Sequence, residues 1–164
     1  MPFDVPNSRI AKLIGGSAAA GLVALTSFSE NTIHHTYWDP VPVLTACTGH
    51  TDAALRIGQT FTDAECNAFL DDDLVKAAQG MQDCVQVMLS DGELIAYTDF
   101  SLNEGYAAFC NSSMARLVNQ GDHEGACRIL PQYNKAHIGG KFVVLKGLTR
   151  RRVSELDFCL KGLQ

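Results

Sequence analysis

The sequence lacks several features that would each indicate a particular class of protein. It contains no internal repeat and no low-complexity linker, and 164 residues leave no room for a second full domain. It also lacks an excess of basic residues: the formal net charge is -5, whereas a nucleic-acid-binding surface would be basic. With 46% hydrophobic residues, the chain is expected to form one compact core and to bind no nucleic acid.

Cys-x-x-Cys pairs, the common spacing of zinc and thioredoxin-like sites, are also absent. The six cysteines are Cys47, Cys66, Cys84, Cys110, Cys127 and Cys159. An even number indicates disulfides, with fifteen possible pairings; free thiols in a cytosolic protein are the alternative. Proximity along the chain favours Cys47 with Cys66 and Cys110 with Cys127, which leaves Cys84 for Cys159. Disulfides imply an oxidising compartment, here the periplasm.

Charge is missing from one long stretch, residues 13–28, which follows Arg9 and Lys12. A helix of this length reaches about 24 Å, short of the roughly 30 Å hydrocarbon core of a bilayer. The run is also weakly hydrophobic, because its small or polar residues include Gly15, Gly16, Ser17, Gly21, Thr26 and Ser27. The composition favours export and disfavours permanent anchoring.

Several interpretations of this run remain open. A cleaved signal peptide could use Ala18-Ala19-Ala20 as its cleavage site, although the run continues apolar almost to Glu30. A stable transmembrane anchor would be longer and richer in leucine and isoleucine. The other interpretations are a segment that enters the membrane and later leaves it, and a helix of an ordinary protein core.

The stretch from Glu30 to Thr51 carries the strongest indication of chemistry. Eight residues separate Glu30 from Asp39, and five separate Asp39 from Thr45. The segment is rich in β-branched and aromatic residues and is interrupted by prolines, so a short extended hairpin is expected there. A glycosidase needs one carboxyl group to protonate the leaving oxygen and another to hold water on the opposite face of the sugar.

This spacing resembles the phage-type lysozymes of glycoside hydrolase family 24, the endolysins with which tailed phages lyse their hosts. The resemblance begins with Glu30, Asp39, Thr45 and Gly49-His50-Thr51, and covers roughly residues 28–160. Its later landmarks are Arg56–Thr60, Thr62–Cys66, Asn103–Gly105, Ser112-Ser113, Gly121-Asp122, Gly147-Leu148 and Arg151-Arg152. Asn31 and Pro42 depart from the family, which usually has glycine at both positions, so the cleft can differ in shape.

The resemblance implies a role for each residue of the motif. Glu30 would be the general acid, Asp39 the carboxylate that holds the attacking water, and Thr45 a second hydrogen-bond partner of that water, in an inverting reaction. The implied activity is that of a muramidase, which hydrolyses the β-1,4 bond between N-acetylmuramic acid and N-acetylglucosamine in peptidoglycan without a cofactor or metal. The alternative is a lysozyme-like fold that has lost catalysis and serves as a membrane-tethered wall-binding module.

The resemblance also implies substrate contacts for Thr51, Leu102 and Ser113. The apolar run resembles the signal-arrest-release segments of some endolysins, which divides the chain into a signal-anchor segment, 1–28, and a catalytic domain, 29–164. The protein would first be tethered and idle in the host inner membrane, and then be released into the periplasm as an active monomer. Packing of the released run onto the domain would carry Glu30 towards Asp39.

The remaining pattern predicts an α+β fold, with a small lobe that holds a β-hairpin and a larger, mostly helical lobe. The resemblance implies that this fold is lysozyme-like and that a long helix joins the two lobes. Thr62 with Glu65 and Ser90 with Glu93 form capping boxes, which predict that helices start there. The first helix is expected to run to Gly80 and the second through residue 102.

Shorter elements are expected towards the carboxyl terminus. Helices should begin at Ser112 or Ser113 and at Asp122, and a loop with a short apolar run should follow over residues 139–145. A final helix is expected to start near Thr149 and to turn Val153, Leu156 and Leu160 inward.

Four polar groups are expected to have structural roles. His34 and His35 are adjacent in a predicted strand and point to opposite faces, so they cannot share one metal ion. His50 is expected to be a structural hydrogen-bonding residue. Residues 71–73, three aspartates, should form a solvated helix face, and residues 150–152, three arginines, should pair with carboxylates in the helical lobe.

Overall fold

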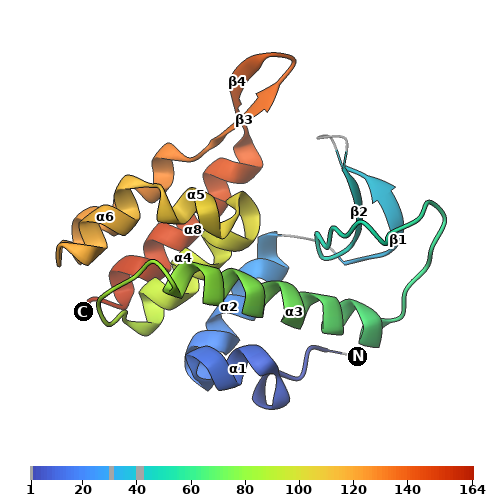
Figure 1. The fold of residues 1–164 in the computed structure, drawn as a ribbon, viewed down its shortest axis with the longest axis horizontal. Helices are drawn as coiled ribbons and strands as arrows, with labels where there is room; N and C mark the ends of the chain where they lie inside the picture. The colour runs from blue at the N-terminus through green and yellow to red at the C-terminus, as the bar shows by residue number, and fades with distance from the viewer. Residues whose placement is uncertain (1, 30–31, 40–42) are drawn as a thin grey trace.

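The computed structural model describes residues 2–29, 32–39 and 43–164 and confirms the predicted α+β architecture (Figure 1). A small lobe holds one β-hairpin, a larger lobe is mostly helical, and the long helix α3 (Asp63–Gln82) runs between them. The described residues do not include Glu30, which is predicted to be the general acid. They also do not include Asn31 and Pro42, the two departures from the family.

The small lobe is built on strands β1 (Ile33–Trp38) and β2 (Leu44–Cys47), which pair antiparallel with Tyr37 opposite Thr45. Its small core consists of Ala46, Cys47, Leu55 and Cys66, with Leu44, Phe61 and Phe69 packed against it. The predicted hairpin is therefore present, and it packs against the first turns of α3.

Both predicted capping boxes are present, and each begins a helix where the sequence predicts one. Thr62 caps α3 and Ser90 caps α4 (Asp91–Glu104), and each hydroxyl accepts a hydrogen bond from the glutamate amide three residues on. Helix α4 lies at the centre of the helical lobe and is buried over most of its length, including Tyr97 and Phe100. Gly92 is required there, because a Cβ atom would lie 2.2 Å from the Phe158 carbonyl oxygen.

Shorter helices complete the lobe: α5 (Tyr106–Cys110), α6 (Ser113–Asn119), α7 (His123–Cys127) and the 3-10 turn η2 (Leu130–Gln132). Strands β3 (Lys135–Ile138) and β4 (Lys141–Val144) then form a second hairpin where the sequence predicted a loop. The prediction missed it because the hairpin is exposed on both faces and therefore shows no alternation of apolar and polar residues.

Helix α8 (Lys146–Lys161) begins three residues before the predicted start. The prediction that Val153 points inward is wrong, since this side chain is 55% exposed, whereas Leu156 and Leu160 are partly buried. Arg151, Arg152 and Glu155 are buried in its place. The inward face of α8 is thus partly charged, which an apolar periodicity cannot reveal.

The amino-terminal run packs against the body of the protein in this structure. After the turn η1 (Val5–Asn7) it forms α1 (Arg9–Ile14) and α2 (Gly16–Ser29), separated by Gly15 in a left-handed backbone conformation with φ 90°. Its buried side chains, which contact α3 and α4, are Ile10, Ile14, Ala18, Ala19, Leu22 and Leu25. Within the described residues, no helix is both long and apolar enough to span a bilayer.

Small residues allow α2 to approach α4 closely. A Cβ atom on Gly21 would lie 2.6 Å from Cδ1 of Ile95, and Ala18 and Ala19 are fully buried. Gly21, one of the residues that weaken the run as a membrane segment, therefore also allows it to pack on the folded protein.

The six cysteines form three disulfides, and the structure corrects two of the predicted pairs. Cys47–Cys66 is confirmed, whereas the other two bonds are Cys84–Cys110 and Cys127–Cys159. Proximity in sequence failed because the turn after α3 lies beside the end of α5, and α7 lies beside α8. Each bond closes a loop of 19 to 32 residues, for which chain entropy gives a stabilisation of about 3–4 kcal/mol.

Candidate active site

Asp39 and Thr45 lie on the small-lobe hairpin. Asp39 directly follows β1, its side chain is exposed, and its backbone N–H donates to the Val43 carbonyl oxygen at 3.1 Å. Thr45 lies in β2 and is 2% exposed, and its Oγ1 donates to the same carbonyl oxygen, also at 3.1 Å. Because the hydroxyl proton of Thr45 is used within the hairpin, its oxygen is left as an acceptor for a further donor such as water.

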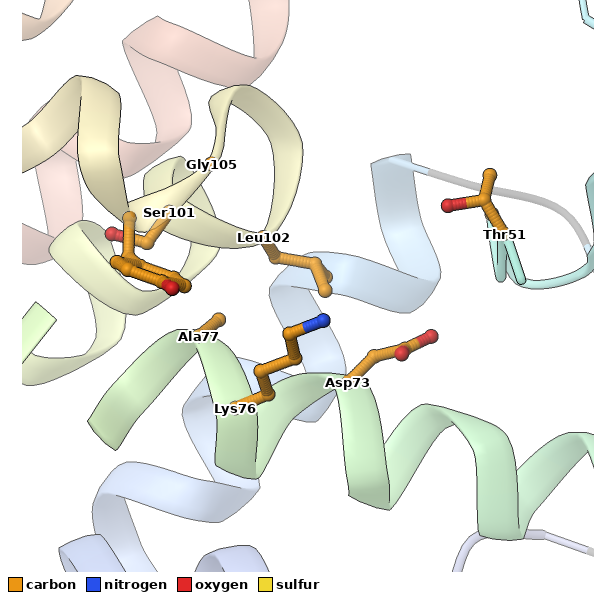
Figure 2. A pocket seen from close by; sticks show the side chains of 9 residues that line it. Thr51, Asp73, Lys76, Ala77, Ser101, Leu102 and Gly105 are labelled. Atoms are coloured by element: carbon orange, nitrogen blue, oxygen red, sulfur yellow. The ribbon is translucent and has the colours of Figure 1, made fainter. Parts of the chain in front are cut away.

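A cavity of about 290 Å³ separates the two lobes (Figure 2). Gly49 and Thr51 line it from the small lobe, and the other lining residues, from α3, α4 and the start of α5, are Asp73, Lys76, Ala77, Ser101, Leu102, Gly105 and Tyr106. This interlobe cleft brings together Thr51 and Leu102, two of the three residues predicted to contact substrate, from opposite sides.

Ser113, the third predicted contact, does not line the interlobe cleft. It lines a separate hollow on the helical lobe with Asn111, Ser112, Arg116 and Asn119. The structure therefore gives the predicted substrate residues two different locations, and Ser113 is not brought near Thr51 and Leu102.

The prediction that residues 71–73 form one solvated face is wrong, because successive helical residues point about 100° apart. Asp71 accepts hydrogen bonds from the backbone N–H groups of Arg9 and Ile10 at the start of α1, and Asp72 pairs with the Arg9 guanidinium. Asp73 faces the interlobe cleft. Asp73 and Lys76, three apart on α3, are cleft residues that helical spacing alone could have grouped.

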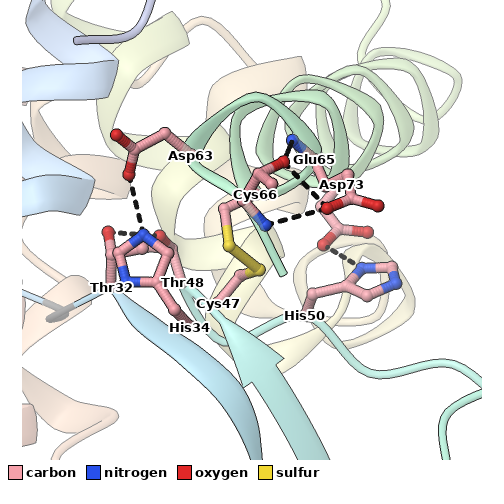
Figure 3. Close-up of a disulfide and its surroundings, with 10 residues drawn as sticks. Thr32, His34, Cys47, Thr48, His50, Asp63, Glu65, Cys66 and Asp73 are labelled. Atoms are coloured by element: carbon pink, nitrogen blue, oxygen red, sulfur yellow. Dashed lines mark hydrogen bonds and ion pairs between the residues drawn. A yellow bond between two sulfur atoms is a disulfide. The ribbon is translucent and has the colours of Figure 1, made fainter. Parts of the chain in front are cut away.

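Asp73 is held by His50, whose Nδ1 lies 2.8 Å from Oδ2 of the carboxylate (Figure 3). The imidazole stacks on the Phe69 ring with centroids 4.2 Å apart and planes 3° from parallel. Burial raises the pKa of Asp73, although the hydrogen bond from His50 and the charge of Lys76 oppose that shift. His50 thus has the predicted structural role, which is to attach the small lobe to α3 beside the cleft.

His34 makes a surface contact that the sequence did not predict. His34 Nε2 lies 2.7 Å from Asp63 Oδ1, and both side chains are about half exposed. Across residues 2–29, 32–39 and 43–164, no three His, Cys, Asp or Glu side chains are grouped so as to hold a metal ion.

A buried ionic cluster lies behind the cleft, where α2, α4 and α8 meet. Arg151 donates to both carboxylate oxygens of Asp99, at 2.8 and 2.9 Å, and Thr26 Oγ1 donates to the same carboxylate at 3.0 Å. Burial by itself would raise the pKa of Asp99, but the charge of Arg151 and the hydrogen bonds from Arg151, Glu155 and Thr26 together lower it. The predicted pairing of the arginine run with carboxylates is confirmed at Arg151.

Arg152 and Glu155 form the second half of this cluster. Arg152 Nη2 lies 3.1 Å from Glu155 Oε1 and also donates to Asn103 Oδ1, and its guanidinium lies over the Phe100 ring. Burial raises the pKa of Glu155 well above the ordinary value of a carboxyl group, even though the Arg152 charge opposes the shift. The cluster therefore combines an ionised carboxylate at Asp99 with a carboxyl group that favours its proton.

Thr26 connects this cluster to the amino-terminal run. It lies on the last turn of α2, four residues before Glu30, and is fully buried. From the sequence, Thr26 is expected only to weaken the apolar run, because its partner, Asp99, is 73 residues away in the chain.

Comparisons of the sequence with protein families and with known proteins match most of the chain to phage lysozymes. The family model described as Phage lysozyme matches residues 27–155. The SAR-endolysin of Bacteriophage PS119 is 37% identical over 163 residues, which cover 96% of this chain and 95% of that protein.

Solved structures agree with this assignment. The muramidase domain of SpmX from Asticaccaulis excentricus is 28% identical with a TM-score of 0.77, covering 86% of this chain and 95% of its own. The active form of the P1 phage endolysin Lyz has the same TM-score at 22% identity, covering 94% of this chain and 93% of its own, which shows a shared fold. Since the family model spans most of the sequence and a relative is more than 30% identical over nearly its full length, the chain belongs to the phage lysozyme family.

Proposed function

We propose that the protein is an endolysin that hydrolyses the β-1,4 bond between N-acetylmuramic acid and N-acetylglucosamine in peptidoglycan and thereby lyses the host cell. Glu30 is the general acid, Asp39 holds and polarises the attacking water, and Thr45 is a second partner of that water. The observation that carries this proposal is the spacing of these three residues inside the segment that matches the phage lysozyme family.

The arrangement of the lobes supports the proposal. An extended polysaccharide needs a groove that is open at both ends, and clefts between lobes are the usual location for such ligands. The interlobe cleft offers a hydroxyl on Thr51, a carboxylate on Asp73 and an ammonium on Lys76. These groups suit a substrate that is rich in hydroxyl and amide groups.

An inverting reaction has simple requirements for protons. The acid gives its proton to the glycosidic oxygen as the bond to the anomeric carbon breaks, and the base takes a proton from the water that attacks the opposite face. Asp39, exposed at the end of β1, is open to such a water. Thr45 Oγ1, which already donates to Val43, can accept a hydrogen bond from it.

Replacement of Glu30 by Gln tests the assignment of the acid. We expect the parent protein to clear permeabilised Gram-negative cells and Glu30→Gln to lose activity at least about a hundredfold, the lower range for general acid catalysis. Glu124→Gln, on an exposed ion pair with Arg128, is the matched control and should remain active. Equal clearing by the parent and Glu30→Gln would overturn the assignment and favour the wall-binding module, which the comparisons do not favour.

The stereochemistry of the reaction can be tested separately. Proton NMR of the first product formed from a soluble peptidoglycan fragment should show the α-anomer, because an inverting enzyme converts the β-linkage in a single displacement. A β-anomer as the first product would refute the role of Asp39 as the residue that holds water.

We further propose that the run within residues 1–28 first tethers the protein in the host inner membrane and later leaves it for the periplasm, where the monomeric enzyme acts. The packing of α1 and α2 supports this: their buried side chains and the Thr26–Asp99 hydrogen bond offer the released run a stable location. A cleavage after Ala20 would remove the buried side chains of Ile10, Ile14, Ala18 and Ala19 from the body that they contact, which favours retention of the run over its removal.

The two faces of α2 allow the tether to be tested without disturbing the enzyme. Ala20 and Ala24 are exposed, so replacing both with Leu adds apolar surface away from the packed face. These changes make membrane insertion about 1 kcal/mol more favourable. We expect a larger membrane fraction and later lysis, while the purified soluble form keeps its melting temperature. Ala20→Ser with Ala24→Ser should do the opposite, and an unchanged distribution in both variants would contradict the tether.

A further inference from the structure

The β3–β4 hairpin projects from the helical lobe beyond the ends of the helices (Figure 1). Its pairs are Lys135 with Val144, Ala136 with Val143, His137 with Phe142 and Ile138 with Lys141, and Gly139 and Gly140 make the turn. Exposed fractions are 76% for Phe142, 54% for Val144, 47% for Ile138 and 42% for Val143. The large apolar side chains of the hairpin are thus exposed rather than buried.

Both faces of this two-stranded sheet are uncovered. Paired residues share a face and successive residues alternate, so Phe142 and Val144 lie on one face, and Ile138 and Val143 lie on the other. An antiparallel sheet in a soluble protein normally covers its apolar face with the protein core, and an isolated hairpin is only marginally stable in water. Apolar side chains on both faces therefore point to an external partner that surrounds the hairpin.

The charges around the hairpin are all of one sign. Residues 125–154 contain no aspartate or glutamate but hold seven of the 13 lysines and arginines of a chain whose net charge is -5. Lys135, Lys141, Lys146 and Arg150 are exposed, and among the described residues none of them has an ion-pair partner within 4.0 Å. The partner must therefore carry negative charge.

The composition of the hairpin favours a lipid surface over a sugar or a peptide as the partner. From Lys135 to Lys146 there is no hydroxyl, amide or carboxyl side chain, which are the groups that would recognise a sugar or a peptide by hydrogen bonds. The exposed side chains of the hairpin are mainly large apolar ones and lysines. That combination matches a surface with acyl chains below and phosphate groups above.

We propose that the tip of the β3–β4 hairpin inserts into the surface of an anionic lipid bilayer. Ile138 and Phe142, which lie near the turn, enter the boundary between headgroups and acyl chains. Lys141, beside the turn, extends its ammonium group back to the lipid phosphates, and Lys135, at the open end of the hairpin, contacts them directly. This contact is separate from the amino-terminal run and does not depend on the catalytic assignment. It would hold the released enzyme against the membrane, beside the wall that it degrades.

The insertion can be observed directly with a single tryptophan. The chain has one, Trp38 in the small lobe, so Trp38→Phe combined with Phe142→Trp moves the probe to the hairpin tip. With vesicles of phosphatidylglycerol and phosphatidylethanolamine, we expect a blue-shifted emission and quenching by brominated acyl chains. Phosphatidylcholine vesicles and high salt should abolish both. Emission that does not change with anionic vesicles would overturn the proposal.

Vesicle sedimentation of the full-length soluble protein measures the contribution of each group. Phe142→Ser should weaken binding at least about tenfold, and Lys135→Gln with Lys141→Gln about twenty-fivefold at low salt. Met88→Ser is the matched control, since Met88 is 92% exposed elsewhere on the helical lobe, and it should bind like the parent.

Other outcomes would refute the membrane contact. All variants keep the amino-terminal run, so binding due to that run alone would leave Phe142→Ser equal to the parent. Self-association that disappears in Phe142→Ser, with lipid binding unchanged, would identify a second copy as the partner instead. Loss of hydrolysis of soluble peptidoglycan fragments, again with lipid binding unchanged, would place the hairpin in substrate binding.

Discussion

The hydrogen bond from Thr26 to Asp99 should hold the amino-terminal run in place, and Thr26→Val tests this. Valine has nearly the shape of threonine but lacks the hydroxyl, so the change removes the bond and leaves the packing of α2 almost unaltered. A hydrogen bond to a charged group contributes about 1.5–3 kcal/mol. Because Arg151 still donates to the same carboxylate oxygen, we expect the lower part of this range, about 1.5–2 kcal/mol.

In a chain of 164 residues, each kcal/mol lowers the melting temperature by about 2–4 °C, so the expected decrease is about 3–8 °C. Thermal unfolding of the purified soluble protein, followed by circular dichroism, measures it. Thr26→Ser keeps the hydroxyl and is the matched control. A double-mutant cycle with Asp99→Asn isolates the pairwise energy. If Thr26→Val and Thr26→Ser melt at the same temperature, or if the cycle shows no coupling, the bond does not hold the run.

Three further predictions concern other parts of the molecule. Folding raises the pKa of Glu155 above about 4.5, its value in the unfolded chain. The contribution of this group to the free energy of unfolding is therefore fully present below about pH 4.5. It is lost as the pH rises towards the pKa in the folded protein, by up to about 1.4 kcal/mol per pH unit. Glu155→Gln should therefore flatten the dependence of urea unfolding on pH above 4.5, and an unchanged slope would contradict this. Replacement of Cys84 and Cys110 by serine should remove one of three disulfides, seen as a smaller mass change on reduction, and lower stability by about 3–4 kcal/mol; a disulfide map without this bond would refute the pairing. Gly80→Ala would place a Cβ atom 2.3 Å from the base of the Tyr106 ring, so we expect that ring to shift within the cleft, stability to fall and KM to rise. An unchanged KM would show that the ring makes no contact with substrate.

Local signals in the sequence predicted the helices well. Thr62 with Glu65 and Ser90 with Glu93 each satisfy two backbone groups within one turn, so these helix starts need no information from the rest of the chain. The small-lobe hairpin is also local, because prolines and β-branched residues exclude one continuous helix there.

Features that depend on distant partners could not be predicted. The pairing of Cys84 with Cys110 depends on the packing of α5 against the turn after α3, which chain proximity does not encode. Arg152 and Glu155 are fully buried in contact with each other, so a search for apolar periodicity selected the exposed Val153 instead.

Of the residues that line the interlobe cleft, the sequence indicated Thr51 and Leu102 but not the residues beside them. Thr51 and Leu102 are 51 positions apart and meet across the cleft because α3 holds the two lobes at a fixed separation. Asp73 is one of three consecutive aspartates, and the sequence does not distinguish it from the other two. They differ because successive residues of a helix point in different directions, so that Asp71 contacts α1 and Asp73 contacts His50.

The Cys47–Cys66 disulfide has a consequence for how the protein resists proteases. It closes residues 47–66 into a covalent ring, and the exposed loop within that ring carries Thr51 to the edge of the cleft. A single cut between residues 48 and 65 would leave the two fragments joined through sulfur. In a denaturing gel, a molecule cut once by a protease in this loop would therefore migrate as an intact chain until it is reduced. The wall of the cleft that this loop forms would stay covalently attached after the cut.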